Sequence, residues 1–428
     1  MKCNLSIAFA SGLLIFFSVA CAVGEADRHL EKLRDEVRTD LTGSLLPFWM
    51  EKVTDTVNGG FHGKVGVDDK VYPEAERGGV VNSRILWTFS AAYRVLKDPE
   101  YLATASRAKD YIEKHFLDRD YGGAYRSVPY RGMPADARKQ VYIQSFFLYA
   151  FSEYFRAAGD SSALDQAIGI YDLIEKYAFD RDHNGYFELF TRDWIRSRER
   201  LIGEKSLKEE KTMNTHLHLL ESYTNLYRVW PDSALREKVI NLVNIFAGHI
   251  IDNERYHLIS FMERDWKRVS NTDSYGHDIE ASWLLCEATD IIGDKALEER
   301  IRGISIKMAD AAAEGLWPDG SLATEKDLLT GHKGTRRSWW EQAETVVGFL
   351  NAYQLTGNAK YLDHSLKCWE YIKKNMIDHE NGGWYSTVSE SGMPGESDKA
   401  GFWICPYHNG RMALEVMERV TSLKIRNK

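Results

Sequence analysis

The sequence has little of several features that mark common classes of protein. It has 55 Lys and Arg residues against 63 Asp and Glu residues, a formal net charge of −8. Because contacts with nucleic-acid phosphates need a basic surface, we expect no nucleic-acid partner. Only 9 of the 428 residues are Pro and no low-complexity tract occurs, whereas 44% are hydrophobic. The composition therefore argues against a disordered chain and supplies a large packed core.

Cysteines, cofactor motifs and long apolar runs are also scarce. Beyond the first 22 residues only Cys286, Cys368 and Cys405 occur, without C-x-x-C spacing. Neither a disulfide framework nor a structural zinc site is expected from them. No G-x-G-x-x-G after an expected strand and no phosphate-binding P-loop is present, so we expect chemistry without a cofactor. No apolar run after the N-terminus is long enough to span a membrane.

Residues 1–22 have the pattern of a bacterial secretion signal. Lys2 precedes an apolar run from Ile7 to Val19, and small residues follow it. Cleavage after Ala20-Cys21-Ala22 releases a soluble protein, whereas cleavage before Cys21 leaves a lipidated cysteine. We favour the lipoprotein because Cys is otherwise uncommon at this place, although Ser18 stands where lipoprotein signals usually have Leu. The chain is thus expected to be exported, as a periplasmic protein or a membrane-anchored lipoprotein.

The strongest signal is a repeat of about sixty residues. One motif, an Asp followed by a Gly-containing turn and an aromatic strand, occurs at 55–62, 118–125, 180–187 and 378–385. Its glycines Gly59, Gly122, Gly185 and Gly382 lie 63, 63 and 197 residues apart. The last gap leaves room for two degenerate copies, near Asp252 and Trp317, so six repeats fill the chain.

Each repeat contains two amphipathic segments that differ in polarity. The segment from Tyr101 has apolar residues every three or four positions, as on a half-exposed helix, whereas the segment from Val141 is apolar on nearly every face. Twelve helices that alternate in this way require two concentric rings. We therefore predict an all-α fold, a single (α/α)6 barrel over residues 23–428 with short β-hairpins at one mouth. The inner helices are expected near Ser83, Val141, Met213, Tyr275, Ser338 and Tyr407, and the outer ones near Leu30, Tyr101, Ala163, Ala234, Leu297 and Tyr361.

Polar residues gather at the starts of the expected inner helices. In such a barrel the hairpins precede the inner helices, so these starts converge on one mouth. Several of the polar residues are i,i+3 or i,i+4 pairs, which share one helix face. His216 lies about 200° around the helix from His218, which argues against a zinc site at this pair. The candidate site residues are Arg84, Asn214, His218, His277, Glu280, Trp340, Glu344, Trp403 and His408.

Five segments carry a resemblance to a known family. Residues 82–87, 213–218, 275–280, 339–344 and 403–411 resemble the N-acylglucosamine 2-epimerase superfamily, most closely its cellobiose 2-epimerase branch, with mannobiose as plausible a substrate as cellobiose. The resemblance runs from about Leu30 to Val420. It implies an (α/α)6 barrel and metal-independent chemistry. It also implies catalytic histidines at His218, His277 and His408, supported by Arg84, Asn214, Glu280, Trp340 and Trp403.

The site residues suit inversion of a sugar carbon next to a carbonyl. We predict a 2-epimerase that removes and returns the C2 proton at the reducing end of a β-1,4-linked disaccharide through an enediolate. His277 and His408 would exchange the proton, because imidazole accepts and donates near neutral pH. Arg84 and Asn214, with His218, would bind the enediolate oxygens. Glu280 is expected to orient His277, and Glu344 to orient another ring or bind sugar hydroxyls.

Three alternatives remain open from the sequence. An aldose–ketose isomerase uses the same enediolate but returns the proton to C1. An (α/α)6 glycoside hydrolase needs two carboxylates beside the scissile bond, and Glu280 and Glu344 are the candidate pair. A non-catalytic sugar-binding lipoprotein needs only the Trp platforms. Loops at 196–211 and 389–397 are expected to set the length of the substrate, and the oligomeric state is left open.

Overall fold

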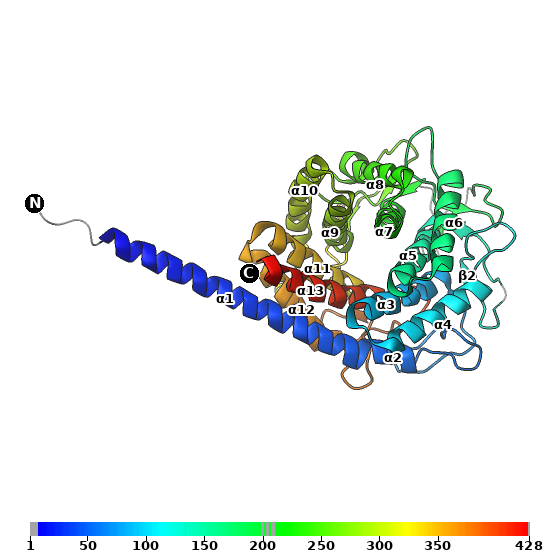
Figure 1. Ribbon diagram of the computed structural model, residues 1–428, viewed down its shortest axis with the longest axis horizontal. Helices are drawn as coiled ribbons and strands as arrows, with labels where there is room; N and C mark the ends of the chain where they lie inside the picture. The colour runs from blue at the N-terminus through cyan, green and yellow to red at the C-terminus, as the bar shows by residue number, and fades with distance from the viewer. Residues whose placement is uncertain (1–6, 133, 198–200, 203–204, 207–209, 427–428) are drawn as a thin grey trace, which may run out of the picture.

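The computed structural model describes residues 7–132, 134–197, 201–202, 205–206 and 210–426, and its helices form two concentric rings (Figure 1). Each inner helix packs against the next, and the last packs back against the first, which closes the ring. The (α/α)6 barrel expected from the sequence is thereby confirmed. The inner helices are α3 (Gly79–Leu96), α5 (Val141–Ala158), α7 (Met213–Val229), α9 (Tyr275–Ile292), α11 (Trp339–Thr356) and α13 (Tyr407–Arg426).

The outer ring covers the inner one, helix against helix. Each outer helix packs on the inner helix of its repeat and keeps its other face in water. Two of them end in a π-helical turn, α1 in η1 (Leu41–Leu45), which leads into α2 (Leu46–Glu51), and α8 in η2 (Phe246–Ile250). The outer helices are α1 (Ile7–Asp40), α4 (Pro99–His115), α6 (Ser161–Tyr177), α8 (Ser233–Ile245), α10 (Lys295–Ala313) and α12 (Ala359–Asn375).

The turns from inner to outer helices are short and share one design. Gly159, Gly293 and Gly357 adopt the left-handed conformation that ends an inner helix, with φ of 71°, 72° and 67°. The next residue caps the outer helix, because its side chain accepts a backbone N–H of the first turn. The caps are Asp98, Asp160, Asp232, Asp294 and Asn358.

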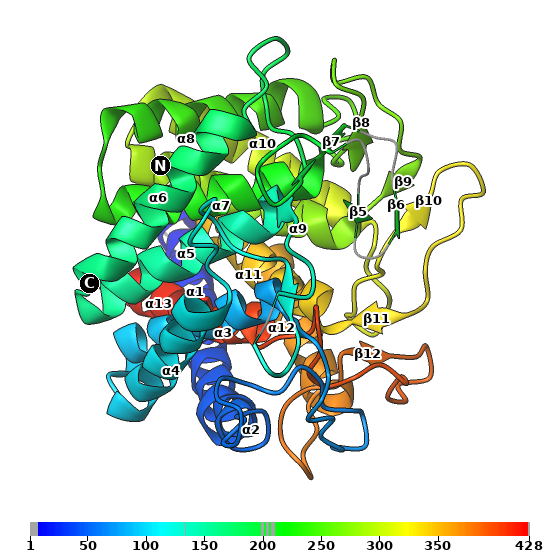
Figure 2. The same cartoon turned by 90° about the vertical axis from the view of Figure 1, so that its right-hand side faces the viewer.

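The opposite end of the barrel carries the long connections from outer to inner helices, and the strands gather there (Figure 2). The turn of the sequence motif forms the same antiparallel bridge in six places, including the two degenerate repeats, and the turn at 252–257 does so without a glycine. This recurrence confirms the six repeats. The bridges join Thr54 to Phe61, Leu117 to Ala124, Phe179 to Tyr186, Ile251 to Leu258, Leu316 to Leu322, and Ile377 to Trp384.

Most of the two-residue strands pair with a strand of the neighbouring repeat and do not form a hairpin within their own repeat. The sequence did not indicate this pairing between repeats. The strand before each of five inner helices pairs with the connection that follows, as where Arg77 lies opposite Val128. Only β5 (Leu201–Ile202) and β6 (Lys205–Ser206) form a local hairpin among the described strands. The other pairs are β1 (Arg77–Gly78) with β2 (Ser127–Val128), β3 (Lys139–Gln140) with β4 (Leu189–Phe190), β7 (Lys211–Thr212) with β8 (Phe261–Met262), β9 (Thr272–Asp273) with β10 (Lys326–Asp327), and β11 (Arg337–Ser338) with β12 (Thr387–Val388).

The Asp of the repeated motif anchors each hairpin by a buried ion pair. The Oδ1 of Asp118 accepts backbone N–H groups of its own turn, and its Oδ2 lies 2.9 Å from the Nζ of Lys139. Arg192 adds a second cation at 2.9 Å. The Lys stands two residues before an inner helix, so the pair ties the hairpin to that helix. Asp55 with Arg77 and Asp180 with Lys211 repeat the arrangement. Asp378 pairs with Lys399, which lies in the connection before α13.

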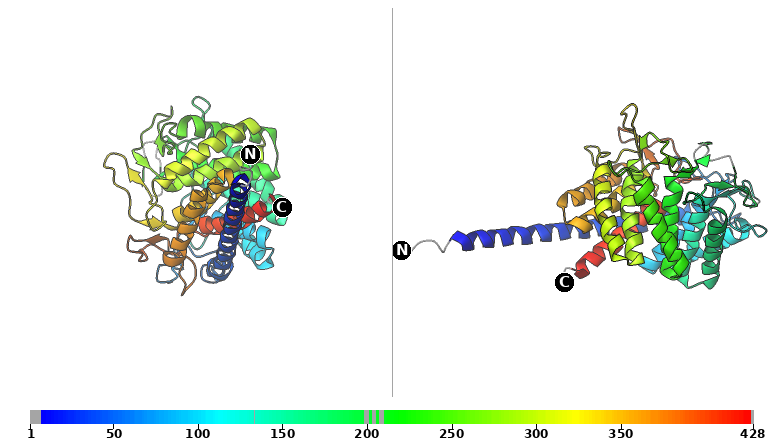
Figure 3. Two further views of the ribbon diagram at one scale, coloured as in Figure 1. Left: turned by 90° about the vertical axis from the view of Figure 1, so that its left-hand side faces the viewer. Right: turned by 90° about the horizontal axis from the view of Figure 1, so that it is seen from above.

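The N-terminal helix α1 extends well beyond the barrel (Figure 3). Residues 1–6 of the expected secretion signal lie outside the described residues, and α1 begins at Ile7. Within the described part of the chain, no helix is both long and apolar enough to cross a membrane. Export and lipidation at Cys21 stay predictions.

Candidate active site

A cavity of about 230 Å³ lies at the end of the barrel where the inner helices begin. Every inner helix contributes at least one residue to its wall. Eight of the nine predicted site residues line it, and the ninth, Glu344, lies behind His408 and contacts it. The lining residues are Arg84, Tyr142, Asn214, His218, His277, Glu280, Trp339, Trp340, Trp403 and His408.

The repeat places most of these side chains in register. The second residue of an inner helix faces the cavity in α5, α7, α11 and α13, as Tyr142, Asn214, Trp340 and His408. The sixth residue faces it in α3, α7 and α9, as Arg84, His218 and Glu280. Residues four apart share one helix face, so the two positions form successive layers on the barrel axis.

Two lining residues, Tyr142 and Trp339, were missed by the sequence analysis. Tyr142 belongs to the most apolar inner helix, where an aromatic residue is typical of core. Its position as the second residue of α5, equivalent to Asn214 in α7, was the signal that could have found it. Trp339 begins α11, next to the predicted Trp340.

Buried carboxylates orient two of the three site histidines. The Nδ1 of His408 lies 2.7 Å from Oε1 of Glu344, and the Nδ1 of His218 lies 2.9 Å from Oε2 of Glu221. An ionised carboxylate only accepts hydrogen bonds, so each ring carries its proton on Nδ1 and leaves Nε2 as the basic nitrogen. Glu344 thus contacts a site histidine, as expected, whereas Glu221 was not predicted.

His277 is held differently from the other two rings, and the expectation that Glu280 orients it is wrong. The Nδ1 of His277 lies 2.7 Å from the hydroxyl of Ser274, at the start of α9. Glu280 instead accepts a hydrogen bond of 2.6 Å from Arg411. A guanidinium is the stronger partner for a buried carboxylate, because its charge compensates the carboxylate's loss of hydration.

Burial keeps the site imidazoles neutral at pH 7. It lowers the pKa of His277 to about 3, with a further contribution from His218. It also lowers the pKa of His408 to about 3, although the hydrogen bond to Glu344 opposes the shift. The pKa of His218 is lowered by burial as well. Neutral rings with a free nitrogen are suited to accept a proton as general bases.

One guanidinium holds three carboxylates together next to the cavity. Arg411 donates to Glu221, to Glu280 at 2.6 Å and to Glu344 at 2.7 Å, and all four side chains are about 1% exposed. Burial raises the pKa of Glu280, and the charge of Glu344 raises it further. Burial acts on the other two carboxyls as well, but Arg411 and the histidines outweigh it. The pKa of Glu344 is lowered, and that of Glu221 falls to about 2.

The same cluster contains three side chains of the kinds that bind metal ions. The ligand atoms of Glu280, Glu344 and His408 lie within 4.8 Å of one another. Arg411 already supplies the positive charge between the two carboxylates, so this set fits a guanidinium better than a divalent cation. At the rim, Asp180, Asp182 and His183 form a second such group, and Arg264 pairs with both of its carboxylates.

Aromatic rings and one further cation complete the wall. Trp340 lies between two histidines, with its ring centre 4.7 Å from that of His277 and 5.6 Å from that of His408. Arg84 donates to the hydroxyl of Tyr142 at 2.9 Å, and its guanidinium lies 4.0 Å from the ring centre of Phe146. The cavity thus has the positive charge of Arg84 on α3 and the imidazoles of its three histidines on α7, α9 and α13.

Four buried polar atoms of the cavity wall have no hydrogen-bond partner in the protein. They are Nε of Arg84, Oδ1 of Asn214, Oε2 of Glu280 and Nε1 of Trp339. Leaving a buried polar group unpaired costs about 1–3 kcal/mol, so a ligand that paired with these four atoms would be stabilised. Two N–H donors and two oxygen atoms on residues around one cavity favour a ligand rich in hydroxyl groups.

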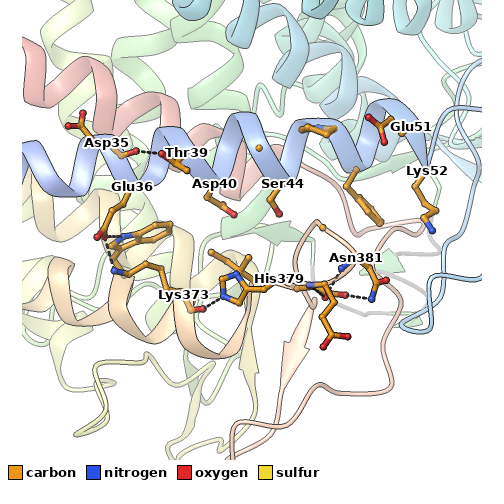
Figure 4. Close-up of a pocket in the computed structure, with 18 of the residues that line it drawn as sticks. Asp35, Glu36, Thr39, Asp40, Ser44, Glu51, Lys52, Lys373, His379 and Asn381 are labelled. Atoms are coloured by element: carbon orange, nitrogen blue, oxygen red, sulfur yellow. Dashed lines mark hydrogen bonds and ion pairs between the residues drawn. The ribbon is translucent and has the colours of Figure 1, made fainter.

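Two other cavities bear on the assignment of the site. A chamber of about 150 Å³, lined by residues that include Gln140, Glu188 and Thr212, adjoins the first and shares Tyr142 and Trp403 with it. A larger groove of about 1000 Å³ lies outside the barrel between α1 and α12 (Figure 4). In that groove Glu36 pairs with Lys373 and Trp369, and Asp40 with Trp384. Its buried polar groups are satisfied, so it lacks the sign of a missing ligand that the axial cavity has.

His216 lies away from the cavity, as its position on the helix predicts. Its Nδ1 lies 2.7 Å from the carbonyl oxygen of Thr212, and its Nε2 accepts the backbone N–H of Tyr186 at 3.0 Å. Both nitrogens are used within the fold. Burial lowers the pKa of His216 to about 4, so the ring is a neutral structural element.

Known proteins resemble this chain over most of its length. A family model described as N-acylglucosamine 2-epimerase (GlcNAc 2-epimerase) matches residues 59–409, a range that contains the whole cavity wall. The cellobiose 2-epimerase of Bacteroides fragilis is 46% identical over 388 residues, 90% of this chain and 99% of that enzyme. That of Dictyoglomus turgidum is 38% identical over 91% of this chain and its own full length. The solved cellobiose 2-epimerase of Bacillus thermoamylovorans has 41% identity and a TM-score of 0.88, covering 91% of this chain and 100% of its own.

Proposed function

The chain belongs to the N-acylglucosamine 2-epimerase family, and we propose that it inverts C2 of the reducing-end sugar in a β-1,4-linked disaccharide. The observation that carries the proposal is the axial cavity, whose lining residues include three neutral histidines and four residues with a buried polar atom that has no partner in the protein. Relatives named for cellobiose support a disaccharide with glucose at the reducing end. β-1,4-Mannobiose has the same linkage and is an equal candidate.

In the proposed mechanism the proton moves between C2 and two histidines. The sugar ring opens when a proton passes from O1 to O5, which exposes the aldehyde and makes the C2–H acidic. One of His277 and His408 takes the C2 proton as the C2–H electrons form the C1–C2 double bond and the carbonyl electrons move onto O1. The proton returns to the opposite face of C2 either from the other ring, which takes a proton from water beforehand, or from the same ring after the intermediate rotates about C2–C3. Neutral rings that share contacts with Trp340 suit this exchange.

Charge on the enediolate oxygens needs fixed donors. Arg84 and Asn214 line the cavity and are proposed to donate to O1 and O2. The proton-free Nε2 of His218 is proposed to accept a hydrogen bond from a hydroxyl group on the same side of the sugar. Trp340 and Trp403 offer aromatic faces for the pyranose rings. The adjoining chamber supports a substrate longer than one sugar, since it shares Trp403 with the main cavity.

The carboxylate geometry disfavours glycoside hydrolysis. A hydrolase needs one carboxyl group on each side of the scissile bond. Glu280 and Glu344 both bind the same nitrogen of Arg411 through one oxygen, and Glu344 also accepts from His408. The Oε1 atoms of the two groups therefore meet at one nitrogen, which places the two carboxyl groups together and not on opposite sides of a bond. An aldose–ketose isomerase differs only in where the proton returns, so experiment has to distinguish it.

Incubation with cellobiose and with β-1,4-mannobiose in heavy water tests the proposal. We expect a disaccharide epimeric at the reducing end, with the glycosidic bond intact and one deuterium at C2. Chromatography separates the products, and NMR locates the deuterium. Monosaccharide products would establish a hydrolase, a keto-disaccharide would establish an isomerase, and unchanged sugars would leave binding alone.

We also propose that the chain is exported from a bacterium and that residues 23–428 form one domain. The N-terminal sequence pattern supports cleavage of the secretion signal. Cleavage before Cys21, with a lipid on that residue, is the favoured outcome, and cleavage after Ala22 is the alternative. Mass spectrometry of the mature protein tests this. A mass that corresponds to a diacylglyceryl cysteine at the N-terminus is expected, whereas a start at Val23 or an intact leader would contradict lipidation.

A further inference from the structure

Arg411 has no contact with the cavity, yet it connects four of the six inner helices. It lies three residues after His408 on α13 and donates to carboxylates on three other helices, Glu221 on α7, Glu280 on α9 and Glu344 on α11. It also donates to the hydroxyl of Tyr407, which itself donates to Glu221. Its guanidinium packs 4.8 Å from the ring centre of Trp283, so the group is fixed on several sides.

Two of these carboxylates are the acceptors of site histidines. Glu221 binds the Nδ1 of His218, and Glu344 binds the Nδ1 of His408. Each chain of contacts therefore runs from the same guanidinium through a carboxylate to an imidazole on the cavity wall. The two histidines belong to α7 and α13, so a single side chain sets the position of rings on separate helices.

The charges in this cluster do not balance, and the imbalance decides which carboxyl holds a proton. Three carboxyl groups share one buried cation, so full ionisation would leave a net charge of −2 away from water. Protonation of Glu280, whose pKa is raised by burial and by Glu344, removes one of these charges. Glu221 and Glu344 stay ionised, and an ionised carboxylate can only accept the hydrogen bond from Nδ1–H.

We propose that Arg411 is a positioning residue that keeps Glu221 and Glu344 ionised and in place, so that His218 and His408 both present a proton-free Nε2 to the substrate. Loss of the guanidinium leaves these carboxyls buried without their counter-ion and favours their protonated forms. A protonated carboxyl no longer selects the Nδ1–H tautomer, and the imidazole loses its orientation and part of its basicity. The inference rests on the proposed function for its effect on rate.

Kinetics of Arg411→Lys and Arg411→Met in the full chain give the first test. We expect kcat to fall by about 10- to 100-fold, the range found when groups that orient a functional ligand are lost. KM should stay close to the wild-type value, because Arg411 does not touch the cavity. The acid limb of the kcat–pH profile should move to higher pH, since Glu221 and Glu344 take up protons more readily. Lys keeps the charge and should lose less than Met.

Arg419→Met is the matched control. Arg419 lies on the same helix and pairs with Glu415 at 2.8 Å, away from the cavity. We expect wild-type kcat and an unchanged pH profile from it. If the Arg411 variants lose activity with no shift of the acid limb, the residue is a structural cation and the proposal is wrong.

Imidazole ¹⁵N NMR gives a second test that does not depend on turnover. In the wild-type protein His218 and His408 should appear as Nδ1–H tautomers, and Arg411→Lys should shift both towards a mixture. Unchanged tautomers in the variant would overturn the inference even if the sugar assignment is right. Conversely, if no sugar is epimerised but the tautomers shift, the proposed function fails while the role of Arg411 stands. If Arg411→Met does not fold, the Lys variant carries both measurements.

Discussion

Buried carboxylates occur in two regions of this barrel and are compensated differently. At the rim, Asp118 has two cations, Lys139 and Arg192, and accepts backbone N–H groups as well. Near the axis, three carboxyl groups share Arg411. Burial tends to raise the pKa of Asp118, but its cations outweigh this and hold the pKa well below its usual range, whereas the pKa of Glu280 is raised. Where cations fully compensate a buried carboxylate, the ion pairs stabilise the fold. Where three carboxyl groups share one cation, one of them keeps a proton close to the cavity.

The comparison predicts its largest effect for loss of an axial histidine. His408→Ala and His277→Ala should each lower kcat by about 10²- to 10⁴-fold, because general acid–base groups contribute on that scale. The temperature of thermal unfolding should change little, because the main effect of these substitutions is on kcat. Steady-state kinetics on the disaccharide that is turned over measures it, with His364→Ala on outer helix α12 as the control. Wild-type kcat in either axial variant would contradict the assigned roles.

The rim should respond in the opposite way, through stability. Asp118→Asn keeps the hydrogen bonds of the turn but leaves Lys139 buried without its counter-charge, which should cost about 3–5 kcal/mol of unfolding free energy. The kcat of the folded enzyme should stay at the wild-type value. Urea denaturation measures the loss, and Asp120→Asn, at the exposed partner of Arg192, should be neutral. Lost activity at unchanged stability would erase the contrast between rim and axis.

Glu280→Gln sharpens the comparison through pH. The folded protein holds a proton on Glu280 that the unfolded chain releases above its ordinary pKa of 4.5, so rising pH favours unfolding of the wild type. Glutamine has no such proton. The variant should therefore gain stability relative to wild type as pH rises from 5 towards neutrality, by up to about 1.4 kcal/mol per pH unit. Thermal unfolding of both proteins across this range measures the difference in stability between the variant and the wild type. A difference that becomes smaller as pH rises would show that Glu280 is ionised.

The smallest expected effect concerns the hydroxyl of Tyr142. Tyr142→Phe removes the acceptor of a 2.9 Å hydrogen bond from Arg84 and keeps the aromatic ring. A single hydrogen bond is worth about 0.5–1.5 kcal/mol, so kcat/KM should fall by roughly 2- to 13-fold. Kinetics compared with Tyr101→Phe, on the outer ring, measures it. An effect as large as that of His408→Ala would make Tyr142 a catalytic group.

Periodicity was enough to predict the rings but not the contacts between them. Most helix starts followed from the alternation of buried and half-exposed segments. The first inner helix begins at Gly79 instead of near Ser83, and the first outer helix begins at Ile7 instead of near Leu30. The site residues followed from the polarity of helix starts in otherwise apolar segments. The partner of Glu280 could not be predicted, because Arg411 is 131 residues away and closer candidates exist. Tyr142 could not be distinguished from core by composition alone.

The direction of the helices has a practical consequence for attaching the enzyme to a surface. Outer helices run towards the opening and inner helices run away from it, so α1 starts and α13 ends at the far face (Figure 3). A lipid, a resin or a fused protein joined to either terminus would hold the barrel by its closed base. Incoming sugar would then meet an unobstructed entrance.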